Sequence, residues 1–168
     1  SMFCVPYFPQ WSNEDNLEQQ INGLRDIEPY VDFISFSLHP FMSALLAESF
    51  PDDYMLQLFE LTSKPIAVSE SSYSAQVWQT VSAPVLTFNG SEQKQQNSLR
   101  LLLEQSNKSG VKFLIWFCVR DYDALWQNAL GSSPDALPWR DTGLYDEQGN
   151  ERSAMDLWKN WYSKSFEG

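Results

Sequence analysis

The chain has 168 residues, with 11 Lys and Arg against 22 Asp and Glu, and a formal net charge of −11. This length fits a single domain with a sizeable core, which we assign to residues 1–168. The acidic balance, with no basic run longer than two residues, disfavours nucleic acid and anionic membranes as partners, because binding either depends on clustered Lys and Arg. An uncharged ligand suits this surface better.

Aromatic residues are abundant, with 7 Trp, 7 Tyr and 11 Phe. Most of them belong in a core, and those in predicted loops offer flat faces against which sugar rings pack. A single histidine and two cysteines predict no metal and no cofactor, and we interpret Cys4 and Cys118 as buried apolar residues rather than a disulfide. No apolar run reaches the roughly 18 residues of a membrane span, and the sequence predicts no cell compartment.

The first half of the chain reads as two strand–helix units. Strand-like runs occupy residues 2–8 and 31–37, and the second run leads into His39. Helical spacing of apolar residues follows each run. The predicted helices cover residues 17–27, 41–48 and 52–61.

A third strand carries the most informative residue. The apolar run Pro65–Val68 is short, β-branched and bounded by Pro and Ser, which is typical of a buried strand, and it ends in the carboxylate of Glu70. In parallel α/β folds the ligand site lies at the carboxyl ends of the strands. Glu70 is therefore a candidate catalytic acid, with a helix-capping or solvated loop carboxylate as the alternative.

The second half continues the alternation. After a loop over residues 71–88, Asn89–Glu92 has capping-box spacing and opens a helix that stops at Ser109–Gly110. The apolar run Val111–Val119 predicts a fully buried strand, and Ser153 opens a last amphipathic helix. Four strand–helix units in a row predict a parallel sheet with right-handed crossovers.

Four stretches in this order resemble one enzyme family. DFISFSLHPF is similar to the sixth strand, KPIAVSESSY to the seventh strand, VKFLIWFCVRDYD to the eighth strand and GLYDEQGNERSAMDLWKNW to the ending of retaining (β/α)8-barrel glycoside hydrolases of the clan A type. The resemblance covers residues 32–162 and implies a TIM-barrel-type half-barrel, strands five to eight, with residues 2–8 as strand five. It also implies a carbohydrate substrate.

The resemblance assigns roles to individual residues. Glu70 matches the nucleophile, and Trp116 matches the eighth-strand Trp that forms the floor beneath the sugar. His39 matches a position that lines the cleft. Weaker candidates for substrate binding, placed by their position after strands, are Tyr73, Asp121 and Trp139.

The sequence departs from the family where it matters for mechanism. Leu38-His39 stands where a Tyr is usual, and Ser71 replaces a frequent Gly. A retaining glycosidase needs a second carboxyl about 5–5.5 Å from the nucleophile, and the family supplies it as Asn-Glu after strand four. The pairs Asn13-Glu14 and Asn150-Glu151 fit a helix cap and a surface turn instead, so the acid/base is expected outside this chain.

Three hypotheses follow. The first is the carboxyl-terminal half of a retaining glycosidase, with Glu70 as its nucleophile. This hypothesis predicts little or no hydrolysis by the chain alone. The second is a non-catalytic carbohydrate-binding or interaction module on a half-barrel scaffold, and the third is a small doubly wound α/β domain. A half-barrel exposes two strand edges, so we expect a homodimer or a missing amino-terminal half to cover them.

Overall fold

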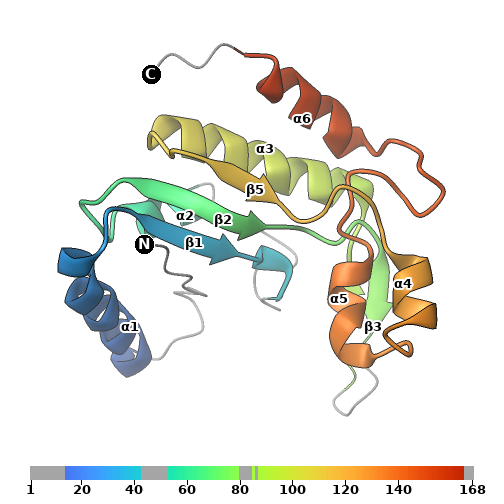
Figure 1. The fold of residues 1–168 in the computed structure, drawn as a ribbon, viewed down its shortest axis with the longest axis horizontal. Coiled ribbons are helices and arrows are strands. Elements are labelled where there is room, and N and C mark those ends of the chain that lie inside the picture. Colours follow the sequence, from blue (N-terminus) through green and yellow to red (C-terminus); the bar gives the residue numbers. More distant parts are fainter. Residues whose placement is uncertain (1–13, 43–52, 80–84, 86, 165–168) are drawn as a thin grey trace.

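The computed structural model describes residues 14–42, 53–79, 85 and 87–164, and these form an α/β fold (Figure 1). The helices are α1 (Glu14–Ile27), α2 (Tyr54–Phe59), α3 (Glu92–Lys108), α4 (Asp123–Asn128), α5 (Leu137–Arg140) and α6 (Ser153–Tyr162). The strands are β1 (Ile34–Leu38), β2 (Ile66–Ser71), β3 (Val77–Gln79), β4 (Thr87–Asn89) and β5 (Leu114–Trp116). Short 3-10 turns follow α1 and β1 and precede α5.

Three strands form the parallel sheet that the alternation of elements predicts. Their order is β1-β2-β5, so β2 is central and pairs in parallel with both neighbours. The expected strand over residues 2–8 lies outside the described residues. The described part of the chain contains no closed barrel, and the half-barrel assignment stays a proposal that is taken up below.

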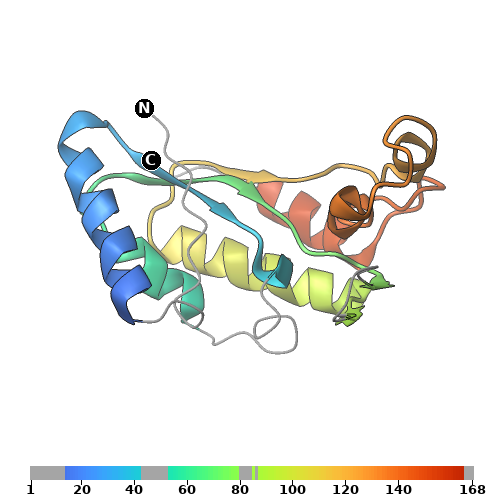
Figure 2. The same cartoon turned by 90° about the horizontal axis from the view of Figure 1, so that it is seen from below.

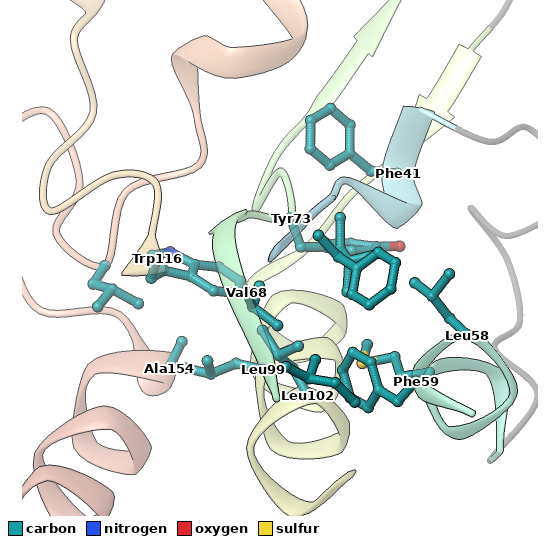
Figure 3. Packing of buried hydrophobic residues seen from close by; sticks show 14 of the residues in the cluster. Phe41, Leu58, Phe59, Val68, Tyr73, Leu99, Leu102, Trp116 and Ala154 are labelled. Carbon is teal, nitrogen blue, oxygen red and sulfur yellow. The ribbon is translucent and has the colours of Figure 1, made fainter. Parts of the chain in front are cut away.

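The helices α1, α2, α3 and α6 lie on one face of this sheet, whereas α4 and α5 lie beyond the carboxyl ends of its strands (Figure 2). Alternate residues of β1, namely Ile34, Phe36 and Leu38, point into the helix layer and are at most 1% exposed. They belong to one buried cluster with Leu99 and Leu102 of α3. The close view of the core shows these two leucines near Val68 of β2 (Figure 3). Burial on this one face holds the sheet and helices together.

The start of α3 differs from the predicted capping box, because its first residue, Asn89, ends β4 and the helix is capped two residues later. The backbone N–H of Lys94 donates to the hydroxyl of Ser91, which is the N-cap residue. Gly110, with a φ of 65°, then lets the chain turn away after the helix. The start of α2 is capped differently, because the backbone N–H groups of Met55 and Leu56 donate to the side-chain oxygen of Gln105 on α3. Asp52, the first residue of the helix expected over residues 52–61, lies outside the described residues.

Two expectations were wrong in extent. The segment 71–88 was expected as a loop, yet it contains β3 and the first two residues of β4, which pair in antiparallel fashion. β5 is three residues long, whereas the apolar run 111–119 predicted a strand of nine. The run is also not fully buried, since Ile115 is 52% and Val119 67% exposed. A continuous apolar run does not reveal that helices cover only one of the two faces.

Among the described helices, none combines the length and the apolar character that crossing a membrane requires.

Candidate functional site at the end of the central strand

Glu70 lies at the carboxyl end of the central strand β2, the position that the sequence predicts for it. The register of β1 and β2 shifts after the pair Phe36 and Val68, so that Ser69 is an extra residue and Ser37 lies opposite Glu70. The hydroxyl of Ser69 donates to the backbone oxygen of Phe36 and closes this bulge. Bulges re-aim side chains beside active sites, and here the bulge brings a hydroxyl next to a carboxylate whose side chain is 43% exposed.

His39 is the second member of the site. Its Nε2 lies 3.5 Å from Oε2 of Glu70 and 3.1 Å from the hydroxyl oxygen of Ser37. Its Nδ1 lies 2.8 Å from the hydroxyl oxygen of Ser72, which is completely buried. His39 itself is 7% exposed, so the imidazole is held on both sides with only its Nε2 edge facing Glu70.

Aromatic rings enclose the imidazole. Trp139 of α5 meets His39 edge to face at a centroid distance of 4.4 Å, and it also contacts Phe41 at 5.3 Å and Phe117 at 6.1 Å. Trp139 is only half-buried. The site therefore combines a partly exposed carboxylate with a partly exposed indole, and a histidine that contacts both lies between them.

Burial sets the charge of this histidine. It lowers the pKa of His39 below 6.5, and the neighbouring carboxylate of Glu70 raises that pKa by less than burial lowers it. The imidazole is therefore neutral at neutral pH. A neutral imidazole can donate one hydrogen bond toward a carboxylate, which suits a carboxylate that acts as a nucleophile or a base.

Two further predicted site residues lie in the core. Tyr73 is 1% exposed, packs against Phe41 and Phe88, and has its pKa raised to about 12 by burial. Trp116 is 7% exposed, and its indole N–H donates to the backbone oxygen of Thr142. Figure 3 shows both rings among the core side chains. Neither ring has a free face for a sugar.

Asp121 follows β5 as expected, but its carboxylate is engaged. Both of its oxygens accept hydrogen bonds from Arg152, at 3.0 and 2.6 Å, and one of them also accepts the backbone N–H of Gly143. Burial raises the pKa of Asp121 to about 6, although the bonds from Arg152 lower it. Asp121 thus ties the loop after β5 to the start of α6.

Asp121, Asp123 and Asp141 bring carboxylate oxygens within 4.8 Å of one another, the only such acidic group within the described ranges that could hold a metal ion. Arg140 pairs with Asp123 and Asp141, at 3.3 and 2.8 Å, and Arg152 pairs with Asp121. Two guanidinium groups therefore pair with all three carboxylates and offset two of their three negative charges. This cluster is an ion-pair network that fixes α4, α5 and the loop after β5.

Sequence reasoning missed three members of the site: Ser37, Ser72 and Phe117. Ser37 and His39 are two residues apart and so share a face at the end of β1. The same alternation puts Phe117, rather than its neighbour Trp116, on the face where Trp139 lies. Strand periodicity could have found these two residues, whereas no sequence signal marks Ser72.

The whole chain can be compared with solved structures. A GH2 β-galacturonidase from Eisenbergiella tayi bound to glycerol superposes with a TM-score of 0.54 at 18% identity, over 92% of this chain and 31% of that one. The Ruminococcus gnavus β-glucuronidase superposes with a TM-score of 0.54 at 12% identity, over 97% of this chain and 26% of that one. The β-D-glucuronidase of Dictyoglomus thermophilum superposes with a TM-score of 0.51 at 16% identity, over 98% of this chain and 32% of that one. The chain has the fold of part of a glycoside hydrolase.

This likeness is one of structure. No family model and no curated protein sequence matches the chain. The chain spans less than a third of the length of each of these three glycosidases. The relation to glycoside hydrolases implied by the four sequence stretches is thus confirmed for the fold.

Proposed function

We propose that this chain is the carboxyl-terminal half of a retaining glycoside hydrolase barrel and that Glu70 is its nucleophile. The observation that carries the proposal is the position of Glu70 at the end of the central strand, partly exposed and in contact with a buried neutral histidine. Trp139, half-buried against that histidine, replaces Trp116 as the proposed sugar platform. The fold shared with glycosidases supports this assignment.

The acid/base carboxyl comes from elsewhere. A retaining mechanism needs two carboxyls about 5–5.5 Å apart, and within the described residues no second carboxylate contacts Glu70 or His39. One carboxyl cannot both attack the anomeric carbon and protonate the leaving group. We therefore expect no hydrolysis by this chain alone.

Further polypeptide covers the open side of the sheet in the intact enzyme. Within the described part of the chain, β1 and β5 are the edge strands. A groove of about 500 Å³ runs beside β5, between α3 and α6. Its apolar lining includes Leu103, Val111, Phe113, Trp158, Trp161 and Tyr162. We propose that the missing half adds a strand to β5 and packs a helix into this groove, and that a second copy of the chain is the alternative.

The sugar is proposed to be neutral. The three glycosidases above are a galacturonidase and two glucuronidases, and a uronic acid carries a carboxylate that calls for a cationic partner. Arg140 is the basic residue next to Trp139, and it is already paired with Asp123 and Asp141. With a net charge of −11, the site favours a substrate without a carboxylate.

The decisive experiment measures aryl-glycoside hydrolysis by the intact enzyme, in which this chain is joined to the polypeptide that completes the barrel. Glu70→Gln is expected to abolish turnover while the fold persists. Glu104→Gln is the matched control, because the Glu104 side chain is 50% exposed, comparable to Glu70 at 43%, but lies on α3 in a pair with Arg100. Turnover that survives Glu70→Gln contradicts the assignment.

A non-catalytic carbohydrate-binding module is the second candidate, favoured by the lack of a carboxylate partner for Glu70 among the described contacts. Both candidates predict sugar binding that Trp139→Ala weakens. They differ once the barrel is completed: hydrolysis supports the glycosidase, and binding without hydrolysis supports the module.

A further inference from the structure

Every hydrogen-bond partner of Glu70 in the described structure lies on one of its two oxygens. The hydroxyl of Ser37 donates to Oε2 at 3.5 Å, and Nε2 of His39 approaches the same atom at 3.5 Å. No described residue donates to Oε1. The two carboxylate oxygens are therefore unequal: Oε2 carries the contacts with the described residues, and Oε1 carries none, in a side chain that is 43% exposed.

The Glu70 carboxylate determines which group donates in each of these hydrogen bonds. An ionised carboxylate only accepts hydrogen bonds, so Ser37 must donate to Oε2. The Ser37 oxygen is then free to accept from His39, 3.1 Å away, which places the imidazole proton on Nε2. Nδ1 is left as an acceptor, and the hydroxyl of Ser72 donates to it at 2.8 Å. Ser72, His39, Ser37 and Glu70 thus form a chain of donors that ends on Oε2, called here the donor chain.

The surroundings hold the donor chain in place. Ser72 is 0% and His39 7% exposed, so water does not compete for their hydrogen bonds. Trp139 and Phe41 meet the imidazole ring nearly at right angles, with interplanar angles of 90° and 73°, and fix its plane. The two 3.5 Å contacts to Oε2 are long, as contacts in unliganded sites often are before substrate tightens them.

We propose that His39, oriented by Ser72, is the positioning residue that holds Oε2 of Glu70, and that Oε1 is the oxygen presented to the sugar. This inference rests on the proposed function for its chemistry, but the donor chain itself is a property of the free protein. When Oε2 is held, the carboxylate does not rotate, and Oε1 stays in the orientation for attack on the sugar. Such orientation lowers the entropic cost of the reaction. Ser72 acts at a distance and touches no substrate.

The test is the tautomer of the imidazole in the full chain. His39 is the only histidine, so a long-range ¹H–¹⁵N correlation spectrum at neutral pH contains one set of ring signals. The expected result is a protonated Nε2 and an unprotonated Nδ1. A proton on Nδ1, or an even mixture of the two neutral forms, overturns the proposal.

Variants separate the donor chain from simple packing. Ser72→Ala removes the donor to Nδ1 and is expected to destroy the single tautomer, whereas Ser74→Ala is expected to leave it unchanged. Ser74 is equally buried, but its hydroxyl donates to the backbone oxygen of Gln76. Glu70→Gln is a second variant at a more exposed position, and its amide, which can also donate, is expected to reduce the Nε2–H population. An unchanged tautomer in either altered variant contradicts the proposal.

The outcome is separable from that of the proposed function. If the Nε2–H form is present and responds to Ser72→Ala, but the completed barrel hydrolyses no glycoside, the donor chain stands and the glycosidase assignment fails. If hydrolysis is present, Ser72→Ala is expected to lower kcat while KM stays unchanged, because Ser72 contacts no substrate. Equal turnover in Ser72→Ala and Ser74→Ala removes the positioning role while Glu70 keeps its own.

Discussion

The indole N–H of Trp116 donates to the backbone oxygen of Thr142 at 3.1 Å, and the hydroxyl of Thr142 donates to the backbone oxygen of Trp139 at 2.8 Å. One threonine thus links a tryptophan in the core to a tryptophan in the site. The two indoles are predicted to have different functions: Trp116 supports the loop that carries Trp139, and Trp139 meets the ligand.

Replacing Trp116 by Phe removes that hydrogen bond and leaves the buried carbonyl of Thr142 without this donor. An unsatisfied buried group costs about 1–3 kcal/mol, so urea denaturation should show a loss of that size in the free energy of unfolding. Sugar affinity should change little beside the loss in Trp139→Ala. A Trp116→Phe variant of full stability that no longer binds sugar would restore Trp116 as the platform.

Arg152 is predicted to be the most costly charged residue to remove. It is 3% exposed and binds both oxygens of Asp121. Arg152→Ala leaves the Asp121 carboxylate buried and unpaired, which costs roughly 3–5 kcal/mol. Arg100→Ala is the control, since its pair with Glu104 is half exposed and should cost less than about 1 kcal/mol. Equal losses in urea denaturation would refute the structural role of the buried pair.

Two glycines are predicted to respond oppositely to alanine. A Cβ at Gly143 would lie 2.4 Å from the backbone nitrogen of Asp121 and 2.5 Å from the backbone oxygen of Tyr145, so Gly143→Ala must displace the loop. Nothing lies within 4 Å of a Cβ at Gly23, inside α1. Gly23→Ala should therefore raise the free energy of unfolding by about 0.5–1 kcal/mol. Thermal melting of the two variants checks both signs.

The stability of the protein should fall as the pH drops below about 6.5 because of His39. Its pKa is lowered in the folded state and is near 6.5 when unfolded. Between the two values the unfolded chain binds the extra proton, so the free energy of unfolding decreases as the pH falls, and this loss ends below the folded pKa. The expected result is a difference between wild type and His39→Gln that changes between pH 7.5 and 5. A constant difference would mean that burial does not shift this pKa.

The sequence predicted the positions of the helices and strands better than it predicted which side of a strand each residue faces. The stop at Gly110 and the position of Glu70 after an apolar run depend on local chemistry, and each was found from a few neighbouring residues. The cap of α3 was placed two residues too early, at Asn89 instead of Ser91. Trp116 was misplaced because a continuous apolar run has no visible period. The pairing of Ser37 with Glu70 depends on the extra residue Ser69, and only the folded sheet reveals that bulge.

The partners of buried polar groups were equally hidden. Asp121 follows a strand just as Glu70 does, so the same rule selected both carboxylates as site residues. Arg152, which is 31 positions further along the chain, turns one of them into a structural anchor. The sequence does not indicate a contact between residues so far apart in the chain. The role of each carboxylate therefore depends on its neighbour in the fold and not on its position after a strand.

The open edge of β5 also has consequences for handling the protein. Among the described strands, β5 has a neighbour on one side only, and a strand with a free ladder and an exposed apolar side chain such as Ile115 is a template for pairing with another extended chain. At high concentration, copies of this chain are expected to add strands to one another along this edge. Under the proposed half-barrel assignment, co-expression with the other half is expected to give more soluble protein than mixing the two afterwards, because each edge is covered as it forms.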